Sequence, residues 1–325
     1  MKKEFNIITI GGATQDIFLI SNQYQVKDGK LQLDWGEKFL ADRLFTDVGG
    51  GACNSAVGFS RLGLSVAFWG KVGMDIPGQV IAQRLKEEKV SIKLLVIDEK
   101  AQTSTSAVLV GKGGERAIVM YRGDNDDLLT HTPSFDLFTQ TEWIYLSDLG
   151  AHTESFTFKI LDLVTNNNSK LAFVPGQHQL KQGIEALKPI LSKSTILILN
   201  IYEAYQLLYG SYPGEEKESC HTNEGNILKM LKEFYQLGPR YVVITRDKCG
   251  VSAYDGRSSY QEASPAVDKV TDTTGAGDAF ASAFITAIIK EKDIRTALSW
   301  GNKNAGSVIA SYGAQYGLLK LSQLE

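Results

Sequence analysis

The amino-acid sequence predicts a single α/β domain over residues 1–325, with a mostly parallel sheet between two helical layers and a small extra β-sheet. Strand-like and helix-like segments alternate from Trp143 onward, which is typical of a parallel sheet with helices on both faces. Two hairpin-like segments, at about 17–48 and 100–122, interrupt this alternation. The chain is 325 residues long and 43% hydrophobic, so it can bury a large core.

The N-terminal part begins with an apolar run, Phe5–Ile10, that predicts a buried strand ending at a pair of glycines. Residues 17–48 alternate apolar and polar side chains around a turn signal at 27–30, so we expect exposed hairpin strands there. The next expected elements, in order, are a helix over 52–62, a strand over 65–69 and a helix over 77–89.

A second hairpin is expected over 103–110 and 116–121, and the simplest arrangement pairs both hairpin segments in one small sheet. Beyond it, the expected strands are 143–146, 170–174, 195–199, 241–245 and 250–254. The expected helices are 154–167, 179–192, 222–236, 276–290 and 293–310, with an exposed loop at 211–221.

Charge and composition exclude several classes of protein. The net charge is −3 and the basic residues are scattered, so we expect neither nucleic acid nor a membrane as a partner. The three cysteines and four histidines show no metal-ligand spacing, which predicts reduced thiols and no histidine zinc site. The first apolar run is too short for a signal peptide, so a cytoplasmic location is expected.

The strongest chemical signal is the segment DTTGAGDAF at 272–280, a small-residue loop that leads into an apolar and therefore buried helix. The first N–H groups of a helix lack internal partners and carry partial positive charge. Glycines at 275 and 277 let a ligand approach this backbone closely. The segment therefore suits a transferring phosphoryl group.

Asp278, in the first turn of that helix, has two interpretations. It can be one of the many acids that stabilise a helix start. An acid that points into an anion-binding site can instead accept the proton of a substrate hydroxyl during phosphoryl transfer. Other phosphate chemistries have no motif here, because the chain lacks a P-loop, the protein-kinase signatures and the GxGxxG fingerprint.

These motifs together resemble the ribokinase-like, or PfkB, family of carbohydrate kinases over nearly the whole chain. DTTGAGDAF matches the family's C-terminal signature, and GGGACN at 49–54 resembles its glycine-rich segment. GKVGMD at 70–75, GER at 114–116 and NIYE at 200–203 follow in family order. The resemblance implies a ribokinase-like three-layer α/β/α sandwich with a lid, and an ATP-dependent kinase that uses Mg²⁺.

The resemblance implies catalytic roles for Asp278 as the base and for the backbone at Gly275, Ala276 and Gly277 as the anion hole. The substrate-binding residues that it implies are Asp16, Gly50, Gly51 and Asn54. A carboxylate such as Asp16 can accept two hydrogen bonds from a vicinal diol. The alternatives are a solvated loop aspartate at Asp16 and a flexible turn at the glycines.

For the nucleotide, the resemblance implies contacts from Thr245, Gly250, Asn302 and Asn200. Asn200 and Glu203 match an NxxE motif whose Glu holds Mg²⁺ through water, although the same spacing forms a helix capping box. The chain departs from the family pattern at Asp247, which stands where the family usually has Gly and would repel phosphates. The family often binds a monovalent cation such as K⁺ near Asp272 and Thr274.

The substrate is open among a free ribose-like sugar or hexose, a nucleoside and a phosphosugar. Gly51 stands where ribokinases typically have Lys, which weakens a ribokinase assignment. The basic residues Lys71, Arg116 and Arg122 would suit a phosphosugar, and the aromatic residues Tyr24, Trp35, Phe39 and Tyr121 a nucleobase. Relatives often pair their lids in a homodimer. A different class of function is a catalytically silent sugar- or nucleotide-binding regulator on the same fold.

Overall fold

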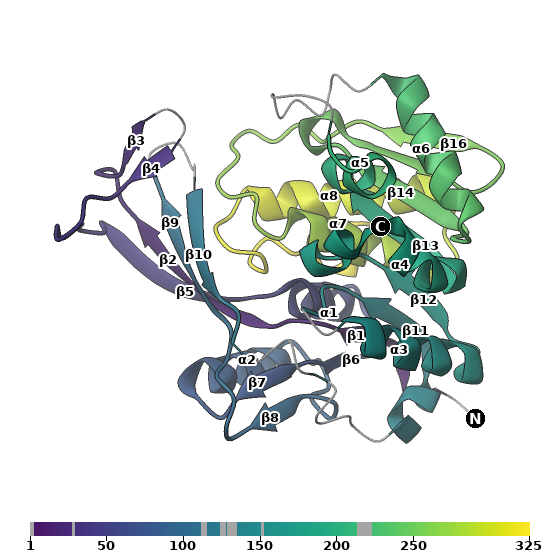
Figure 1. Ribbon diagram of the computed structural model, residues 1–325, viewed down its shortest axis with the longest axis horizontal. Helices are drawn as coiled ribbons and strands as arrows, with labels where there is room; N and C mark the ends of the chain where they lie inside the picture. The colour runs from purple at the N-terminus through teal and green to yellow at the C-terminus, as the bar shows by residue number, and fades with distance from the viewer. Residues whose placement is uncertain are drawn as a thin grey trace.

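The computed structural model describes residues 3–27, 30–111, 116–123, 128, 135–150, 153–212 and 223–325. A large α/β body carries a small β-sheet that projects from one side of it (Figure 1). The expected turns at 28–29 and 112–114, and most of the expected loop at 211–221, lie outside the described residues.

The body is built on a sheet with the strand order β16-β15-β14-β13-β12-β11-β1-β6. β1 runs parallel to β11 and β6, and only β15 and β16 run antiparallel to their neighbours. The strands are β1 (Phe5–Ile10), β6 (Val66–Trp69), β11 (Thr141–Leu146), β12 (Lys170–Phe173), β13 (Ser194–Asn200), β14 (Tyr241–Thr245), β15 (Val251–Tyr254) and β16 (Ser259–Glu262). The prediction of a mostly parallel central sheet is confirmed.

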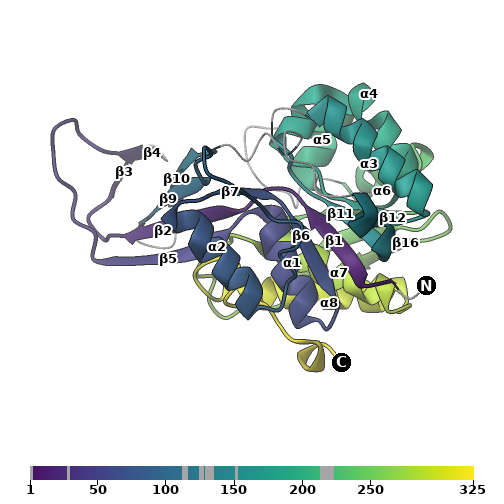
Figure 2. The same cartoon turned by 90° about the horizontal axis from the view of Figure 1, so that it is seen from below.

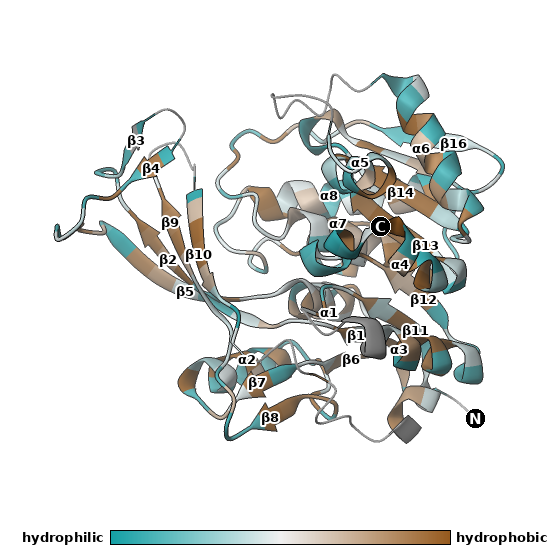
Figure 3. Ribbon diagram, in the orientation of Figure 1, coloured by the Kyte–Doolittle hydropathy of each residue, from teal (hydrophilic) through white to brown (hydrophobic). Residues whose placement is uncertain are grey.

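Helices cover both faces of this sheet (Figure 2). They are α1 (Gly51–Arg61), α2 (Ile76–Glu87), α3 (Thr153–Asn167), α4 (Gln177–Lys193), α5 (Ile201–Tyr209), α6 (Glu224–Gln236), α7 (Ala276–Ile289) and α8 (Ile294–Ile309). Successive residues of β1 point to opposite faces: Ile7 packs with α1, α7 and α8, whereas Ile8 packs with α3 to α6. The strands are apolar along most of their length (Figure 3), as burial on both faces requires.

The small sheet has the strand order β10-β9-β2-β5. Its strands are β2 (Thr14–Ile20), β5 (Arg43–Gly49), β9 (Thr105–Val110) and β10 (Arg116–Tyr121), so segments on both sides of α1 and α2 contribute. Phe18 stacks on Phe45 with 4.4 Å between ring centroids, and Tyr312 from the body packs against Phe45. One face of the small sheet therefore looks toward the body.

Several elements differ from expectation. The sequence reasoning missed α5, β16 and the short strand pair β7 (Lys71–Gly73) with β8 (Val96–Asp98). The hairpin expected around the turn signal at 27–30 is present as β3 (Gln25–Lys27) and β4 (Lys30–Gln32). Helix α4 begins before the expected 179 and is kinked at Gly183, whose φ of 80° is left-handed. Cys53 is a buried free thiol, but Cys249 is disulfide-bonded, so the prediction of reduced cysteines is wrong for Cys249.

Candidate active site

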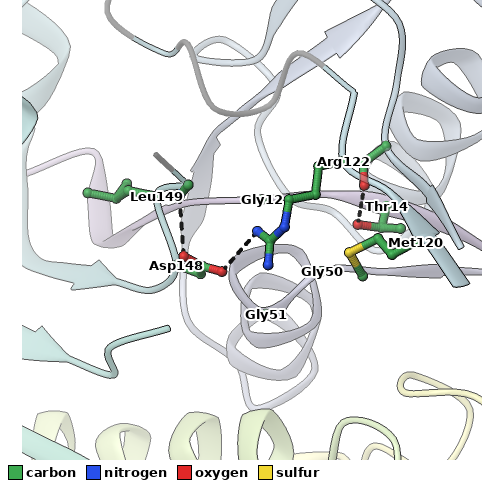
Figure 4. Close-up of a pocket in the computed structure, with 10 residues that line it drawn as sticks. Gly12, Thr14, Gly50, Gly51, Met120, Arg122, Asp148 and Leu149 are labelled. Atoms are coloured by element: carbon green, nitrogen blue, oxygen red, sulfur yellow. Dashed lines mark hydrogen bonds and ion pairs between the residues drawn. The ribbon is translucent and has the colours of Figure 1, made fainter. Parts of the chain in front are cut away.

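A pocket opens where the carboxyl ends of β1 and β11 meet the small sheet (Figure 4). It is lined by Gly12, Thr14, Gly50, Gly51, Ser104, Met120, Arg122, Asp148, Leu149 and Gly150. Ligands of open α/β sheets commonly bind outside the carboxyl ends of the strands. The strands thus bring the glycine-rich segment, the loop after β11 and the small sheet around one cavity.

Asp278 lies in the first turn of α7, next to this pocket. The helix begins at Gly275, whose φ of 77° is left-handed, and Gly277 is exposed with open space beside its Cα. The open space beside Gly277 would let an anion approach the first turn, although the Ala276 N–H also donates to the Thr273 carbonyl at 3.4 Å. Burial raises the pKa of Asp278 to about 6, although a hydrogen bond from Asn54 opposes the shift.

Two amide side chains hold the Asp278 carboxylate in place. Asn54 Nδ2 donates to Asp278 Oδ2 at 2.9 Å, and Gln315 Nε2 donates to Asn54 Oδ1 at 3.1 Å. Because Asn54 Oδ1 accepts from Gln315, the amino group of Asn54 must face Asp278. Asn54 and Gln315 are both buried, so their amides cannot exchange these partners for bulk water. Gln315 was not among the predicted site residues.

The glycine-rich segment adjoins Asp278 directly. A Cβ at Gly51 would lie 2.8 Å from Ser147 Oγ and 3.2 Å from Asp278 Oδ1. Gly50 has a φ of 93°, and a Cβ there would lie 2.5 Å from the carbonyl oxygen of Gly12. The backbone contact and the left-handed φ require glycine at Gly50, and the absence of a side chain at Gly51 leaves room for Ser147 and Asp278.

Asp16 lies on β2, buried at the base of the small sheet. Ser106 Oγ donates to its Oδ1, and a Cβ at Gly49 would collide with its Oδ2 at 2.1 Å. Burial raises the pKa of Asp16 to about 6, and the charges of Asp47 and Asp272 contribute to the rise. The structure thus makes Asp16 an enclosed acid rather than a solvated loop residue.

The predicted nucleotide loop follows β14, which ends at Thr245. Asp247 has a left-handed φ of 47°, a conformation that glycine favours and that Asp tolerates better than most residues. Arg246 N–H donates to the Gly250 carbonyl at 2.8 Å and closes the loop. Asp247 therefore has a backbone conformation that glycine adopts readily. Asn302 Nδ2 donates to the carbonyl of Ala263 at 2.8 Å, beside this loop.

Asn200 and Glu203 form the capping box at the start of α5. Asn200 Oδ1 accepts from the Glu203 N–H at 2.9 Å, and Glu203 Oε2 accepts from the Asn200 N–H at 2.8 Å. Burial raises the pKa of Glu203 to about 7, and the charge of Asp278 adds to the rise. The described residues contain no group of three or more His, Cys, Asp or Glu side chains that could hold a metal ion directly. Glu203 and Asn200 would therefore hold Mg²⁺ through water.

Asp272 joins three parts of the chain. Its Oδ1 accepts from the Thr274 N–H at 3.0 Å and the Thr274 hydroxyl at 2.7 Å, and its Oδ2 accepts from the Gly313 N–H at 3.1 Å. Arg116, the first residue of β10, also donates to Oδ1 and forms an ion pair. The side chain of Asp272 is only 3% exposed.

The basic residues considered for a phosphosugar are all paired with acids. Lys71 pairs with Asp98 at 3.0 Å, Arg122 pairs with Asp148 at 3.3 Å, and Arg116 pairs with Asp272. The aromatic residues considered for a nucleobase stay outside the pocket lining: Trp35 is fully exposed, and the hydroxyl of Tyr121 donates to Gln102.

Sequence reasoning did not assign site roles to Thr14, Ser104, Met120, Asp148 and Leu149. Asp148 follows the apolar strand β11, and a polar residue directly after a parallel strand is a signal that could have found it. Ser104 directly precedes β9 and Met120 lies on β10, so both reach the pocket only through the folding of the small sheet. Every helix in the described part of the chain is too short or too polar to cross a bilayer.

Comparisons with known proteins agree with the fold. The sequence pattern that defines the family described as "pfkB family carbohydrate kinase" matches residues 11–321. Ribokinase from Bacillus subtilis is 28% identical over 98% of this chain and 98% of its own length. A 5-dehydro-2-deoxygluconokinase from Clostridium botulinum is 27% identical over 82% of this chain and 79% of its own. The structure of Arabidopsis thaliana ribokinase complexed with ribose and ATP superposes with a TM-score of 0.80 at 20% identity, covering 100% of this chain and 98% of that one.

Proposed function

We propose that this chain, which belongs to the pfkB family of carbohydrate kinases and is a sugar or nucleoside kinase, transfers the γ-phosphoryl group of ATP to a hydroxyl of a neutral free sugar. The observation that carries the proposal is the placement of Asp278. Its carboxylate adjoins the glycine-rich wall of the pocket and stands at the exposed start of α7.

The arrangement supports a direct phosphoryl transfer. A substrate hydroxyl oxygen attacks the γ-phosphorus, the bond from that phosphorus to the β,γ-bridging oxygen breaks, and ADP leaves. The hydroxyl proton passes to Asp278, and Oδ1 is the acceptor because Asn54 already occupies Oδ2. The N–H groups of Ala276, Gly277 and Asp278 would stabilise the charge on the transferring group.

Mg²⁺ would neutralise the phosphate charges, and Glu203 and Asn200 are the residues that would hold it through water. The loop from Thr245 to Gly250 would hold the nucleotide together with the segment around Ala263, whose carbonyl accepts a hydrogen bond from Asn302. We also propose that the protein is cytoplasmic, because its proposed reaction consumes ATP.

The pocket favours a neutral sugar over the two alternatives. A phosphosugar would need unpaired basic groups, but Arg122, the one basic residue among the described residues that line the pocket, is paired with Asp148. A nucleoside would need an apolar or aromatic surface for its base, and none of the described residues of the pocket wall is aromatic. Asp148 lines the pocket and can accept hydrogen bonds from hydroxyl groups, and Asp16, which is buried in the small sheet and is not part of the pocket lining, would offer further acceptor positions.

The small sheet is proposed to act as a lid that closes over the sugar and excludes water. It already supplies Ser104, Met120 and Arg122 to the pocket wall or its margin. We also propose that two chains pair through the outer face of this sheet as a homodimer.

The test is a phosphoryl-transfer screen that measures ADP release with Mg·ATP and a panel of pentoses, hexoses, nucleosides and sugar phosphates. We expect a pentose or hexose to give the highest kcat/KM. Asp278→Asn should lower kcat by about 10²-fold or more while ATP binding survives, because the base is lost and the anion hole remains. A preference for nucleosides or phosphosugars would overturn the substrate class. Inactivity on the whole panel would favour a silent regulator.

A further inference from the structure

Arg116 links the small sheet to the loop that begins the catalytic helix. Its guanidinium donates to Asp272 Oδ1, across 156 positions of sequence. Asp272 lies three residues before Gly275, the residue that precedes α7. The Arg116 side chain is 26% exposed and the Asp272 side chain 3%, so the contact is partly shielded from water.

The Asp272 carboxylate does not fit a monovalent cation. It accepts four hydrogen bonds, from Arg116, from the N–H and hydroxyl of Thr274 and from the Gly313 N–H. Three of these bonds go to Oδ1 and one goes to Oδ2. Each carboxylate oxygen has roughly two lone-pair positions, so Oδ1 has none left for a cation and Oδ2 has one. A cation bound beside Asp272 would also be repelled by the guanidinium.

We propose that the guanidinium of Arg116 supplies the positive charge that this loop needs, so that phosphoryl transfer by this chain requires no monovalent cation. The inference rests on the proposed kinase function and concerns the organisation of its anion hole. Arg116 is a positioning residue: it acts through Asp272 and the loop, and does not touch the reacting atoms.

An arginine suits this role for two reasons. Its charge persists at every physiological pH, and its planar group presents several donors at once. A carboxylate buried to this degree is unfavourable unless a cation compensates it. The charge of Asp272 also reaches Asp16 in the substrate site, so neutralising it favours the ionised form of Asp16.

The hydrogen bonds of Asp272 also hold the loop before α7 in place. Asp272 binds Thr274 on one side and Gly313 on the other, and a Cβ on Gly275 would lie 2.5 Å from Ala314 Cβ. The loop is therefore packed against the segment after α8. Because Arg116 comes from the small sheet, the compensating charge is delivered together with the lid, which a diffusing ion could not do.

The experiment measures kcat with the best sugar substrate at constant ionic strength, with about 0.1 M KCl or about 0.1 M tetramethylammonium chloride. The wild-type chain should change by less than about twofold between the two salts. Arg116→Gln should lower kcat at least about tenfold in tetramethylammonium and regain at least about threefold of it in KCl, because K⁺ can then reach Asp272. Arg43→Gln is the matched control, since Arg43 is an exposed arginine on the opposite edge strand of the small sheet, and it should behave as wild type.

A second readout does not depend on activity. K⁺ should raise the melting temperature of Arg116→Gln in the presence of ADP and leave that of the wild-type chain unchanged. Strong K⁺ activation of the wild-type enzyme, or an Arg116→Gln variant with normal kcat and no K⁺ response, would overturn the inference. If no compound in the substrate panel is phosphorylated, the proposed function fails, and the melting experiment still decides whether Arg116 replaces a cation.

Discussion

At the scale of single residues, the enclosure of Asp278 predicts how activity depends on pH. Burial raises its pKa to about 6, and only the ionised form can accept the hydroxyl proton. We expect kcat to be constant near neutral pH and to fall about tenfold per pH unit below about pH 6. Saturating sugar is needed for this measurement, because Asp16 has a similar pKa and would steepen the decline of kcat/KM. A kcat that stays level down to about pH 4.5 would remove Asp278 from the base role.

Gln315 provides a second test at this scale, because it sets the orientation of the Asn54 amide. In Gln315→Glu an ionised carboxylate can only accept, so Asn54 would turn and present its oxygen to Asp278. We expect the acid limb of kcat to move upward by about one pH unit and kcat to fall about tenfold or more. Gln315→Met keeps the volume without charge and should lower kcat less, with a smaller shift. Identical pH profiles in both variants and the wild-type chain would show that Gln315 only fills space.

The residues that the sequence identified and those that it missed differ in a physical way. Asp278, Asn54 and the glycines lie at element boundaries, where the residue type reflects a local requirement such as a left-handed φ or an open helix start. Gln315 and Asp148 owe their roles to contacts between segments far apart in sequence. The position of Asp148 after a parallel strand is a weak local signal, and no local pattern distinguishes Gln315 from an ordinary polar side chain.

At the scale of elements, apolar runs and the glycines that end them predicted most strands and helices of the body. The short strands β7 and β8 were missed because three residues carry too little pattern. Helix α5 was missed as an element even though its capping box, Asn200 and Glu203, was recognised. The sequence suggested that the two hairpin segments share one sheet only because this was the simplest arrangement. In the structure β2 pairs with β9, and such pairing between distant segments is decided by tertiary packing.

The connection from β5 to α1 carries a prediction of its own. Gly50→Ala should destabilise the fold by at least roughly 1–3 kcal/mol, because the residue has a left-handed φ and the new Cβ would meet the backbone of Gly12 and Ala13. Urea denaturation measures the change in the free energy of unfolding. Gly12→Ala is the matched control, since its Cβ would have nothing within 4 Å, and it should unfold almost as the wild-type chain does. Equal stability of the two variants would contradict the close approach seen in the structure.

At the scale of the whole molecule, the two faces of the small sheet differ. The inner face carries Asp16, Phe18 and Ser106 and covers the site. On the outer face Leu44 pairs with Leu19, which lies beside Leu109 on the next strand. Leucines in a row across three strands form an apolar surface that is unfavourable in water.

The outer face of the small sheet therefore predicts the assembly state. Leu44 and Val119, which are 64% and 66% exposed, should be buried by the same sheet of a second chain. Leu44→Glu with Val119→Glu should convert a dimer to a monomer in light scattering coupled to size exclusion, because four new charges would meet at the interface. Ile97→Glu places a charge on an exposed apolar residue of β8, outside the small sheet, and should leave the mass unchanged. A wild-type chain that is monomeric at every concentration would refute the pairing. If the double variant becomes monomeric and also loses affinity for its sugar, the partner's sheet holds the lid in place, and assembly and substrate binding are linked.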